Sequence, residues 1–513
     1  MNFSDSLRLH ASFYPERECA VCQDRSVTFA QLNTRANKIA NGLLGLGLKR
    51  GDKVSVMLYN CYEYLEVFHA LARIGVALVP ISYRFVPREI EYLINNSESK
   101  GLIYGSEFAD RIEQAWKNFE NVPEKNLIHL GPEGRGHDYG RWSEKGSANE
   151  VVVPIQETDT LYLGYTSGTT GFPKGAISPN SSQLARALVF THEFHITGRD
   201  RILINMPLFH SNALMFSNIT IYLGGTAVIM PRFDAEGSLA TIQKHRTTCT
   251  SMVPQQYERI LNLPEETRRK YDTRSMKNIV CSSSPLHPQT RLAIIDFFSC
   301  ADLYEFYGSS EAGVVTLMLP EDHAQRPNSV GRAAFLQKVR LLDDDRQDVP
   351  LGEVGEIFSK SIIPFGGYYK MPEATAEVMH EGWFTAGDLA YMDEEGYYYL
   401  TDRKKDMIIS GGENIYPVEI EQVIATHPKV LDVAVIGVPE KQWGEVPKAI
   451  VVVRKDMQAT EAEILEYCRD RLAKFKQPKS VDFVEVLPRN PTGKVERRIL
   501  KDKYWKGHDK RIA

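Results

Sequence analysis

The sequence lacks a long apolar run, a strong net charge and an obvious set of paired cysteines. No segment holds the 18 or so consecutive apolar residues that a membrane-spanning helix needs, so no transmembrane helix is expected. Residues 1–5 lack the basic and apolar regions of a secretory signal peptide. The seven cysteines are scattered and odd in number, which suits a reducing compartment. We therefore expect a cytoplasmic protein without a membrane span.

Two further shortages exclude other classes of function. The net charge is -5, which argues against a surface that binds nucleic acid. Cys19 and Cys22 form a C-x-x-C pair, but no second pair and no helix signal follows it. We interpret these two cysteines as ordinary thiols rather than as a metal or redox site.

The 513 residues are 43% hydrophobic and 25% charged, a globular balance in a chain long enough for more than one domain. Residues 54–58 and 76–80 have the composition of strands, and residues 62–73 between them have helical apolar spacing. The same alternation returns with predicted strands at 226–230 and 278–281. Strands that alternate with helices predict a parallel sheet with helical crossovers, and therefore an α/β fold.

The stretch that organises the chain is Y-T-S-G-T-T-G-F-P-K-G at residues 165–175, directly after a predicted strand at 160–164. Its glycines let backbone N–H groups turn toward an anion, its hydroxyls add donors, and Lys174 adds a point charge. The loop differs from a Walker A loop, because Gly175 follows the lysine where a hydroxyl would hold magnesium. Chemistry alone leaves open a phosphate-holding loop and a solvated turn.

This stretch resembles the signature of the adenylate-forming superfamily, which includes acyl-CoA synthetases, carrier-loading adenylation domains and beetle luciferases. Further matches run from about residue 25 to the last twenty residues. The resemblance implies that the loop holds the phosphates of ATP or AMP, through Thr166, Ser167, Gly168, Thr169, Thr170, Gly171 and Lys174.

Other matches imply the rest of a nucleotide site. Residues 304–311 read Y-E-F-Y-G-S-S-E and resemble Y-G-x-T-E, with Ser310 in place of threonine. The resemblance makes Glu311 a catalytic Mg²⁺ ligand, which suits a hard cation that prefers carboxylate oxygen. It also assigns ribose contacts to Asp388 and Arg403. The remaining nucleotide contacts that it implies are Glu305, Tyr307, Ser283 and Ser284, of which the two serines stand where most relatives have glycine.

The acid pocket is expected around residues 209–215. Amino-acid-activating relatives carry aspartate in the position of His210, and a buried ammonium needs such a counter-charge, so an α-amino acid is disfavoured. A fatty or aryl acid is the favoured substrate, and a short functionalised acid remains open. The expected pocket residues are Phe209, His210, Ser211, Asn212, Met215, Val314 and Val315.

The resemblance also implies a mobile second domain. D-R-K-K-D at 402–406 matches the family boundary, with Lys405 as the hinge, and Gly411 and Gly412 belong to a segment that forms the pantetheine tunnel for CoA. Lys494, in a tail motif, is expected to reach the acid and the α-phosphate. The predicted fold is a large α/β domain over residues 1–402, with doubly wound subdomains and a distorted β-barrel, and a small α+β domain over 403–513.

The implied activity is ATP-dependent ligation of a carboxylic acid to CoA through an acyl-AMP intermediate, with Mg²⁺ as cofactor and pyrophosphate and AMP as products. The main alternative is an enzyme that loads an acyl carrier protein. A non-catalytic nucleotide-binding module is disfavoured, because Glu311, Asp388, Arg403 and Lys494 are all present. The expected partners are small molecules, and the oligomeric state, a homodimer included, is left open.

Overall fold

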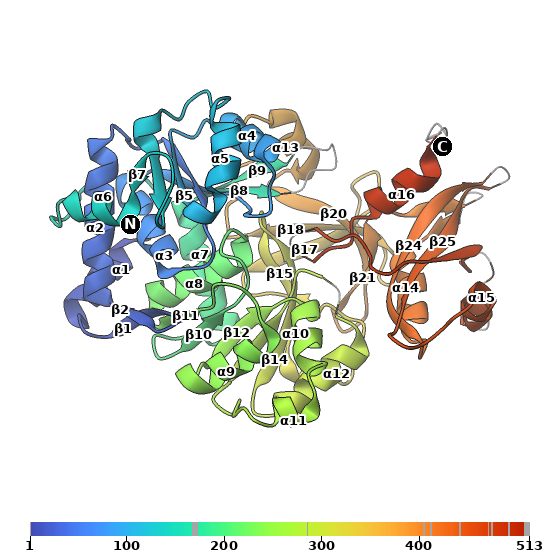
Figure 1. Ribbon diagram of the computed structural model, residues 1–513. Helices are drawn as coiled ribbons and strands as arrows, with labels where there is room; N and C mark the ends of the chain where they lie inside the picture. The colour runs from blue at the N-terminus through green and yellow to red at the C-terminus, as the bar shows by residue number, and fades with distance from the viewer. Residues whose placement is uncertain are drawn as a thin grey trace.

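The computed structural model describes residues 2–166, 173–284, 286–403, 406–410, 413–440, 443–469, 471–472, 474, 476–490 and 493–506, without the side chains of 402, 403, 413 and 414. In these residues the chain forms four sheets. Three belong to a large N-terminal part, and the fourth belongs to a smaller C-terminal part that stands to one side of it (Figure 1). This division agrees with the predicted large and small domains of an α/β chain.

The first sheet has seven strands and is parallel except at one edge. In spatial order its strands are β7 (His137–Asp138), β6 (Leu127–Leu130), β5 (Gly101–Gly105), β3 (Lys53–Met57), β4 (Ala77–Pro80), β8 (Thr160–Thr166) and β9 (Lys174–Pro179). Its crossover helices are α2 (Phe29–Gly45), α3 (Tyr62–Ile74), α4 (Pro87–Asn96), α5 (Ala109–Trp116) and α6 (Tyr139–Lys145). The predicted strands at 54–58 and 76–80 are confirmed as β3 and β4, and the helix between them as α3.

The second sheet has nine strands and takes in the first two strands of the chain. Its order is β16 (Arg332–Ala333), β15 (Gly313–Met318), β14 (Asp302–Ser309), β13 (Asn278–Cys281), β12 (Cys249–Met252), β10 (Arg201–Ile204), β11 (Thr226–Ile229), β1 (Glu18–Cys22) and β2 (Arg25–Thr28). Strand β1 pairs in parallel with β11, in a register that places Ala20 opposite Ala227. Both cysteines of the C-x-x-C pair are buried in β1.

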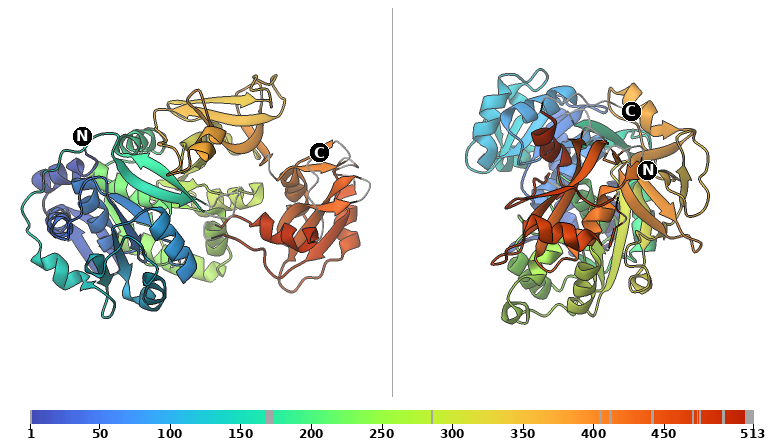
Figure 2. Two further views of the ribbon diagram at one scale, coloured as in Figure 1. Left: turned by 90° about the horizontal axis from the view of Figure 1, so that it is seen from above. Right: turned by 90° about the vertical axis from the view of Figure 1, so that its right-hand side faces the viewer.

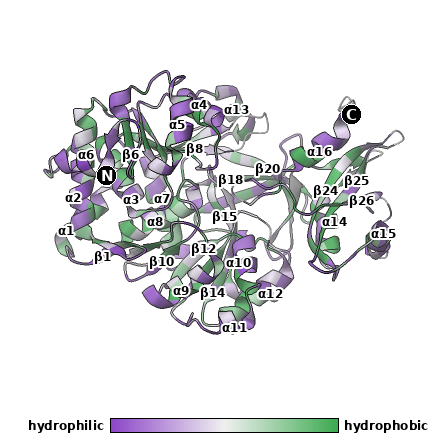
Figure 3. Ribbon diagram, viewed as in Figure 1, coloured by the Kyte–Doolittle hydropathy of each residue, from purple (hydrophilic) through white to green (hydrophobic). Residues whose placement is uncertain are grey.

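The helices of this half are α1 (Asp5–Phe13), α7 (Asn180–Glu193), α8 (Ser211–Leu223), α9 (Ala235–His245), α10 (Pro254–Leu261), α11 (Glu265–Arg268) and α12 (Pro288–Phe297). Helices α3, α7 and α8 lie between the first two sheets (Figure 1). One apolar core joins both sheets and includes Phe68 of α3 and Ile219 of α8. Apolar residues accordingly follow the strands, while the outer helix faces are hydrophilic (Figure 3). Several polar side chains of these three helices are buried, among them Glu66, Arg186 and Asn218.

The third sheet is antiparallel and corresponds to the predicted distorted barrel. It consists of β17 (Gln337–Leu342), β18 (Gly355–Ser361), β20 (Trp383–Met392), β19 (Met379–His380) and β21 (Tyr398–Arg403), with α13 (Pro372–Val378) beside it. Strand β21 is the last element before the small domain.

The small domain has a five-stranded sheet and three helices, α14 (Pro417–Ala425), α15 (Glu461–Arg469) and α16 (Arg497–Trp505). Its strands are β23 (Glu413–Ile415), β22 (Ile408–Ser410), β25 (Gly444–Val453), β24 (Val430–Glu440) and β26 (Ser480–Phe483). The left view of Figure 2 shows this domain beside the large one. Among the described helices, none combines the length and apolar character needed to cross a bilayer.

Candidate active site

The predicted phosphate loop connects β8 to β9. Thr166 ends β8 and pairs with Lys174, the first residue of β9, in an antiparallel register. The Lys174 ammonium lies 5.3 Å from the ring centre of Tyr368. The predicted contacts at Ser167, Gly168, Thr169, Thr170 and Gly171 fall outside the described residues. The strand ends nevertheless place Lys174 beside the carboxylate described next.

Glu311 follows β14 and is 7% exposed. The Tyr368 hydroxyl donates to Glu311 Oε1 at 3.0 Å. Burial and the neighbouring Glu311 raise the pKa of the Tyr368 phenol, so it remains a protonated donor at neutral pH. Lys174, Tyr368 and Glu311 thus form one connected group, in which Tyr368 is a member that no sequence motif indicated.

The surroundings of Glu311 fit a magnesium ion. The second carboxylate oxygen, Oε2, accepts no hydrogen bond from the residues that the structure describes. Mg²⁺ is usually held by one or two protein carboxylates together with substrate phosphates and water. The described residues contain no group of three or more potential ligands, so a metal here would rely on Glu311 and the nucleotide.

A second group of predicted residues meets on the third sheet. The Tyr307 hydroxyl donates to Asp388 Oδ2 at 2.7 Å, and Asp388 is 8% exposed on β20. The backbone of Asp388 is opposite that of Arg403 on β21, whose side chain is not among those described. Glu305, by contrast, has a buried carboxylate that pairs with Arg291. The predicted contact of Glu305 with the nucleotide would therefore have to form while this ion pair is in place.

The serine turn after β13 contacts both helix α8 and helix α10. Asn212 Nδ2 donates to Ser282 Oγ at 3.0 Å, and Ser284 Oγ lies 3.5 Å from Gln255 Oε1. Ser283 has φ +76°, in the left-handed region that favours glycine. The glycine that most relatives are expected to carry here is thus explained by the backbone conformation.

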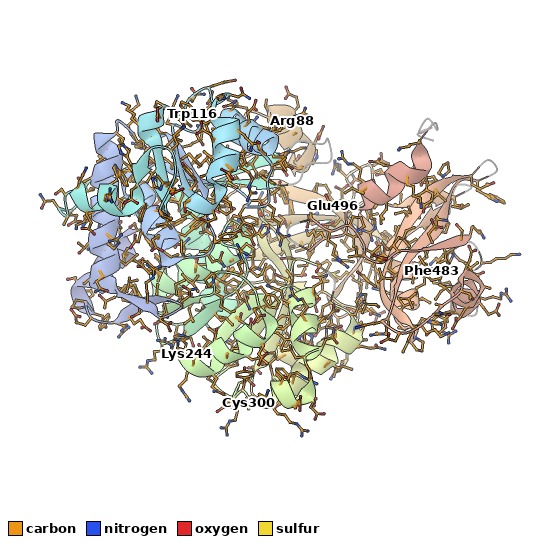
Figure 4. All side chains as sticks on the ribbon, viewed as in Figure 1. Arg88, Trp116, Lys244, Cys300, Phe483 and Glu496 are labelled. Carbon is orange, nitrogen blue, oxygen red and sulfur yellow. The ribbon has the colours of Figure 1, made fainter. Side chains whose placement is uncertain are left out.

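The tail loop of the small domain lies against α10 of the large domain. A Cβ built on Gly493 would lie 3.1 Å from Gln255 Oε1, so the two are in contact. The backbone N–H of the exposed Lys494 donates to Asn490 Oδ1 at 3.0 Å. Figure 4 labels Glu496, two residues further on, at the side of the small domain nearest the large one. The predicted hinge Lys405 and the CoA-binding Gly411 and Gly412 fall outside the described residues.

The expected acid pocket is only partly the one that the structure contains. A small, partly open cavity with about 10 Å³ accessible to the centre of a water molecule lies between α3, α7 and α8, and Ser211 and Met215 of the expected residues line it. Phe209 packs edge-on against Tyr83, and Val314 and Val315 are buried. Sequence reasoning missed the other lining residues, which are Phe68, Tyr162, Ser178, Gln183, Arg186, Leu214, Asn218 and Ser310.

Comparison with known protein families finds two matches along the chain. Residues 7–369 match the family model described as AMP-binding enzyme. Residues 419–494 match the model described as AMP-binding enzyme C-terminal domain. The two matches fall on the large and the small domain respectively.

Individual proteins are similar over almost the whole chain. A long-chain-fatty-acid–CoA ligase, FadD13, from Mycobacterium tuberculosis is 35% identical over 508 residues, which cover 98% of each protein. The solved structure of ATP-bound MatB from Rhodopseudomonas palustris superposes with a TM-score of 0.88 at 31% identity and full coverage of both chains. The o-succinylbenzoate CoA synthetase MenE from Bacillus subtilis, in complex with its acyl-adenylate OSB-AMP, gives 0.85 at 30% identity, with 97% and 98% coverage.

Proposed function

Because this chain belongs to the family of AMP-binding enzymes and is an acid–thiol ligase, we propose that it joins a carboxylic acid to coenzyme A through an acyl-adenylate. One observation carries the proposal. The buried Glu311 and the partly buried Tyr368 and Lys174 form a connected group beside the loop that is expected to hold phosphate. This group would receive a metal–nucleotide complex at a point that the polar acid cavity also reaches, through Ser310.

In the first half-reaction, a carboxylate oxygen attacks the α-phosphorus of ATP, and the bond to pyrophosphate breaks. Bound Mg²⁺ would supply charge neutralisation on the phosphate oxygens. The protein's own part is to position the groups and offset charge, which accounts for most catalysis of phosphoryl and nucleotidyl transfer. Lys174 would supply positive charge at the phosphate loop, Glu311 would hold the metal, and Asp388 would accept hydrogen bonds from the ribose hydroxyls.

In the second half-reaction, the CoA sulfur attacks the acyl carbon of the adenylate and AMP leaves. The thiolate is the reactive form, and a free thiol is mostly protonated at neutral pH. We place the change between the two half-reactions at the connection between β21, which ends at Arg403, and β22, which begins at Ile408. Rotation there would withdraw Lys494 and bring residues 411 and 412 to the site.

The test is carboxylate-dependent exchange of labelled pyrophosphate into ATP, which needs only the first half-reaction. Exchange that depends on added acid and on Mg²⁺ is the expected result. Nucleotide binding without exchange for any acid in a broad panel would leave a binding module as the better description.

The acceptor is tested separately. The predicted outcome is that free CoA converts the adenylate to a thioester and releases AMP. If only a phosphopantetheine-bearing carrier protein accepted the acyl group, the enzyme would belong with the carrier-loading relatives.

A further inference from the structure

Among the side chains that the structure describes in the large domain, three arginines are almost completely buried, and one of them differs from the other two. Arg73 donates to four oxygen atoms of neighbouring residues. Arg291 pairs with the Glu305 carboxylate. Arg186, 2% exposed on α7, has no carboxylate within 4 Å among the described residues. Its charge therefore lacks the counter-charge or full set of acceptors that the other two have.

The contacts of Arg186 leave much of its hydrogen-bonding capacity unused. Its Nη2 donates to the Ser310 carbonyl oxygen at 2.6 Å. Its Nε lies 3.4 Å from Ser182 Oγ, and its Nη1 lies 3.2 Å from the weak acceptor Met215 Sδ. A guanidinium has five N–H donors in a planar fork that matches a carboxylate. Of these donors, only Nη2 makes a short hydrogen bond to an oxygen atom, the Ser310 carbonyl.

The unused donors lie at the wall of the cavity between α3, α7 and α8. Three of its ten lining residues are apolar, namely Phe68, Leu214 and Met215, and the other seven are polar. Asn218, which is 1% exposed, also lines it, and its Oδ1 has no hydrogen-bond partner among the described residues. Pockets for apolar ligands are lined mostly by hydrophobic side chains. This lining is mixed in character, and its polar part includes the unused donors of Arg186, which suit an anionic group.

The backbone beside the guanidinium is kept free of side chains. Gly313 has φ +75°, and a Cβ built there would lie 3.3 Å from Arg186 Nη1 and 2.7 Å from Ile363 Cδ1. A larger residue at 313 would therefore displace Ile363 and crowd the arginine. The position of Arg186 depends on this glycine.

Arg186 stays positively charged in spite of its burial. Burial lowers the pKa of its guanidinium to about 10, and the Tyr162 hydroxyl and the Glu311 carboxylate act to raise it. A buried charge without a close partner is unfavourable, and a partner that brings the opposite charge removes most of that penalty. Glu311 is assigned above to the metal, so it does not fill this role during catalysis.

We propose that Arg186 determines the substrate class, and that the acid activated here is a short dicarboxylic acid whose second carboxylate pairs with Arg186. The inference rests on the proposed function and narrows its substrate from the fatty or aryl acid favoured by the sequence. The space beside Arg186 is small, which favours a short acid over a long one. We assign the contact with the reacting carboxylate to Lys494, because hydrogen bonds from a guanidinium would make the carboxylate oxygen a weaker nucleophile.

The experiment compares mono- and dicarboxylic acids of equal carbon number, from three to six carbons, in pyrophosphate release with ATP, Mg²⁺ and CoA. The wild-type enzyme is expected to prefer a diacid by at least about 1,000-fold in kcat/KM, because a site built to bind a polar group rejects the analogue that lacks it. Arg186→Met should lower kcat/KM for that diacid by about 100–1,000-fold, chiefly through KM, and abolish most of the preference. Arg186→Lys keeps the charge without the fork and should fall between them.

Arg73→Met is the matched control, because it also removes a buried arginine but lies outside the cavity lining. It should lower stability and leave the ratio between diacid and monoacid unchanged. Calorimetric titration of the wild-type protein with each acid, without ATP, tests the pocket independently of turnover and of variant folding. Diacid binding by the wild-type protein that is weakened in Arg186→Lys and lost in Arg186→Met supports the inference.

A wild-type preference for monocarboxylic acids overturns the inference, and so does an equal loss for all acids in Arg186→Met. Either result leaves the proposed ligase intact, since acid-dependent pyrophosphate release continues. The proposed function fails by a different result, the absence of pyrophosphate release with every acid.

Discussion

The nucleotide half and the acid half of this site are built from different kinds of secondary structure. The nucleotide half consists of strand ends and turns, where Lys174, Tyr307, Glu311 and Asp388 occupy short local motifs. The acid half consists of the inward faces of three helices, with Arg186 at its wall. In the proposed reaction, the first half would bind the groups common to every substrate, and the second half would contact the group that varies. Substitutions in the two halves should therefore differ in whether their effect depends on the acid.

The largest expected effect is that of Lys494→Ala. We predict that it slows acyl-AMP formation by about 100–1,000-fold for every acid, the usual loss when one group that stabilises developing charge is removed. Conversion of supplied acyl-AMP with CoA should stay near normal. Single-turnover assays of each half-reaction measure both rates.

Lys405→Pro is the complementary variant, because proline fixes φ near −65° at the expected hinge. If the enzyme is locked in its adenylating arrangement, this variant mainly slows thioester formation. Equal damage to both half-reactions in Lys494→Ala would favour a site with a single fixed conformation.

Glu311→Gln removes the ionised metal ligand and keeps the shape of the side chain. We predict a loss of about 100-fold in turnover, equal for all acids, because a metal ion contributes several kcal/mol of charge stabilisation. Tyr368→Phe, which removes only the bond to Oε1, should cost about tenfold. Turnover of the Glu311 variant near that of wild type at saturating Mg²⁺ would contradict the metal assignment.

Asp388→Ala is predicted to weaken ATP binding by about 1.5–3 kcal/mol, the usual range for hydrogen bonds to a charged group. Titration with ATP in the absence of acid measures this directly. Tyr307→Phe removes the partner of Asp388 without removing the carboxylate, and should have the smaller effect. An ATP affinity that is unchanged in Asp388→Ala would remove this residue from the ribose site.

The smallest expected effect is that of Ser283→Gly, which relieves a left-handed backbone at φ +76°. Relief of the strain, less the extra entropy that glycine loses on folding, should stabilise the protein by about 0.5–1 kcal/mol. Denaturant unfolding compared with wild type measures the gain. The preference among acids should not change, and a shift in it would mean that the serine turn belongs to the acid half.

The sequence predicted the fold and the family better than it predicted the pocket, for a physical reason. The apolar residues of strands such as β3 and β4 indicate from the sequence alone that these strands are buried. A phosphate loop is equally visible, because its glycines and hydroxyl residues follow one another in the chain. The place of Arg186, by contrast, depends on how three helices pack between two sheets. Its one local signal was an arginine flanked by apolar residues, Leu184 and Ala185 before it and Ala187 and Leu188 after it.

Other features outside the motifs were hidden in the same way. Tyr368 reaches Glu311 from a segment 57 positions later, and the contact of Gly493 with Gln255 connects the two domains. Neither pair shares a spacing that a sequence pattern could indicate. The roles of Ser167, Lys405 and Gly412 remain predictions.

The pairing of β1 with β11 has a consequence for the order in which the protein is made. Ala20 leaves the ribosome long before its neighbour Ala227 is synthesised. At about 5–20 residues per second, the delay is roughly 10–40 seconds. During that time the first sheet can begin to form, while β1 and β2, which precede its strands in the chain, have no sheet to join. Strand β1 therefore stays without its parallel neighbour until β11 has been made, and factors that bind apolar nascent segments would have this interval in which to bind it.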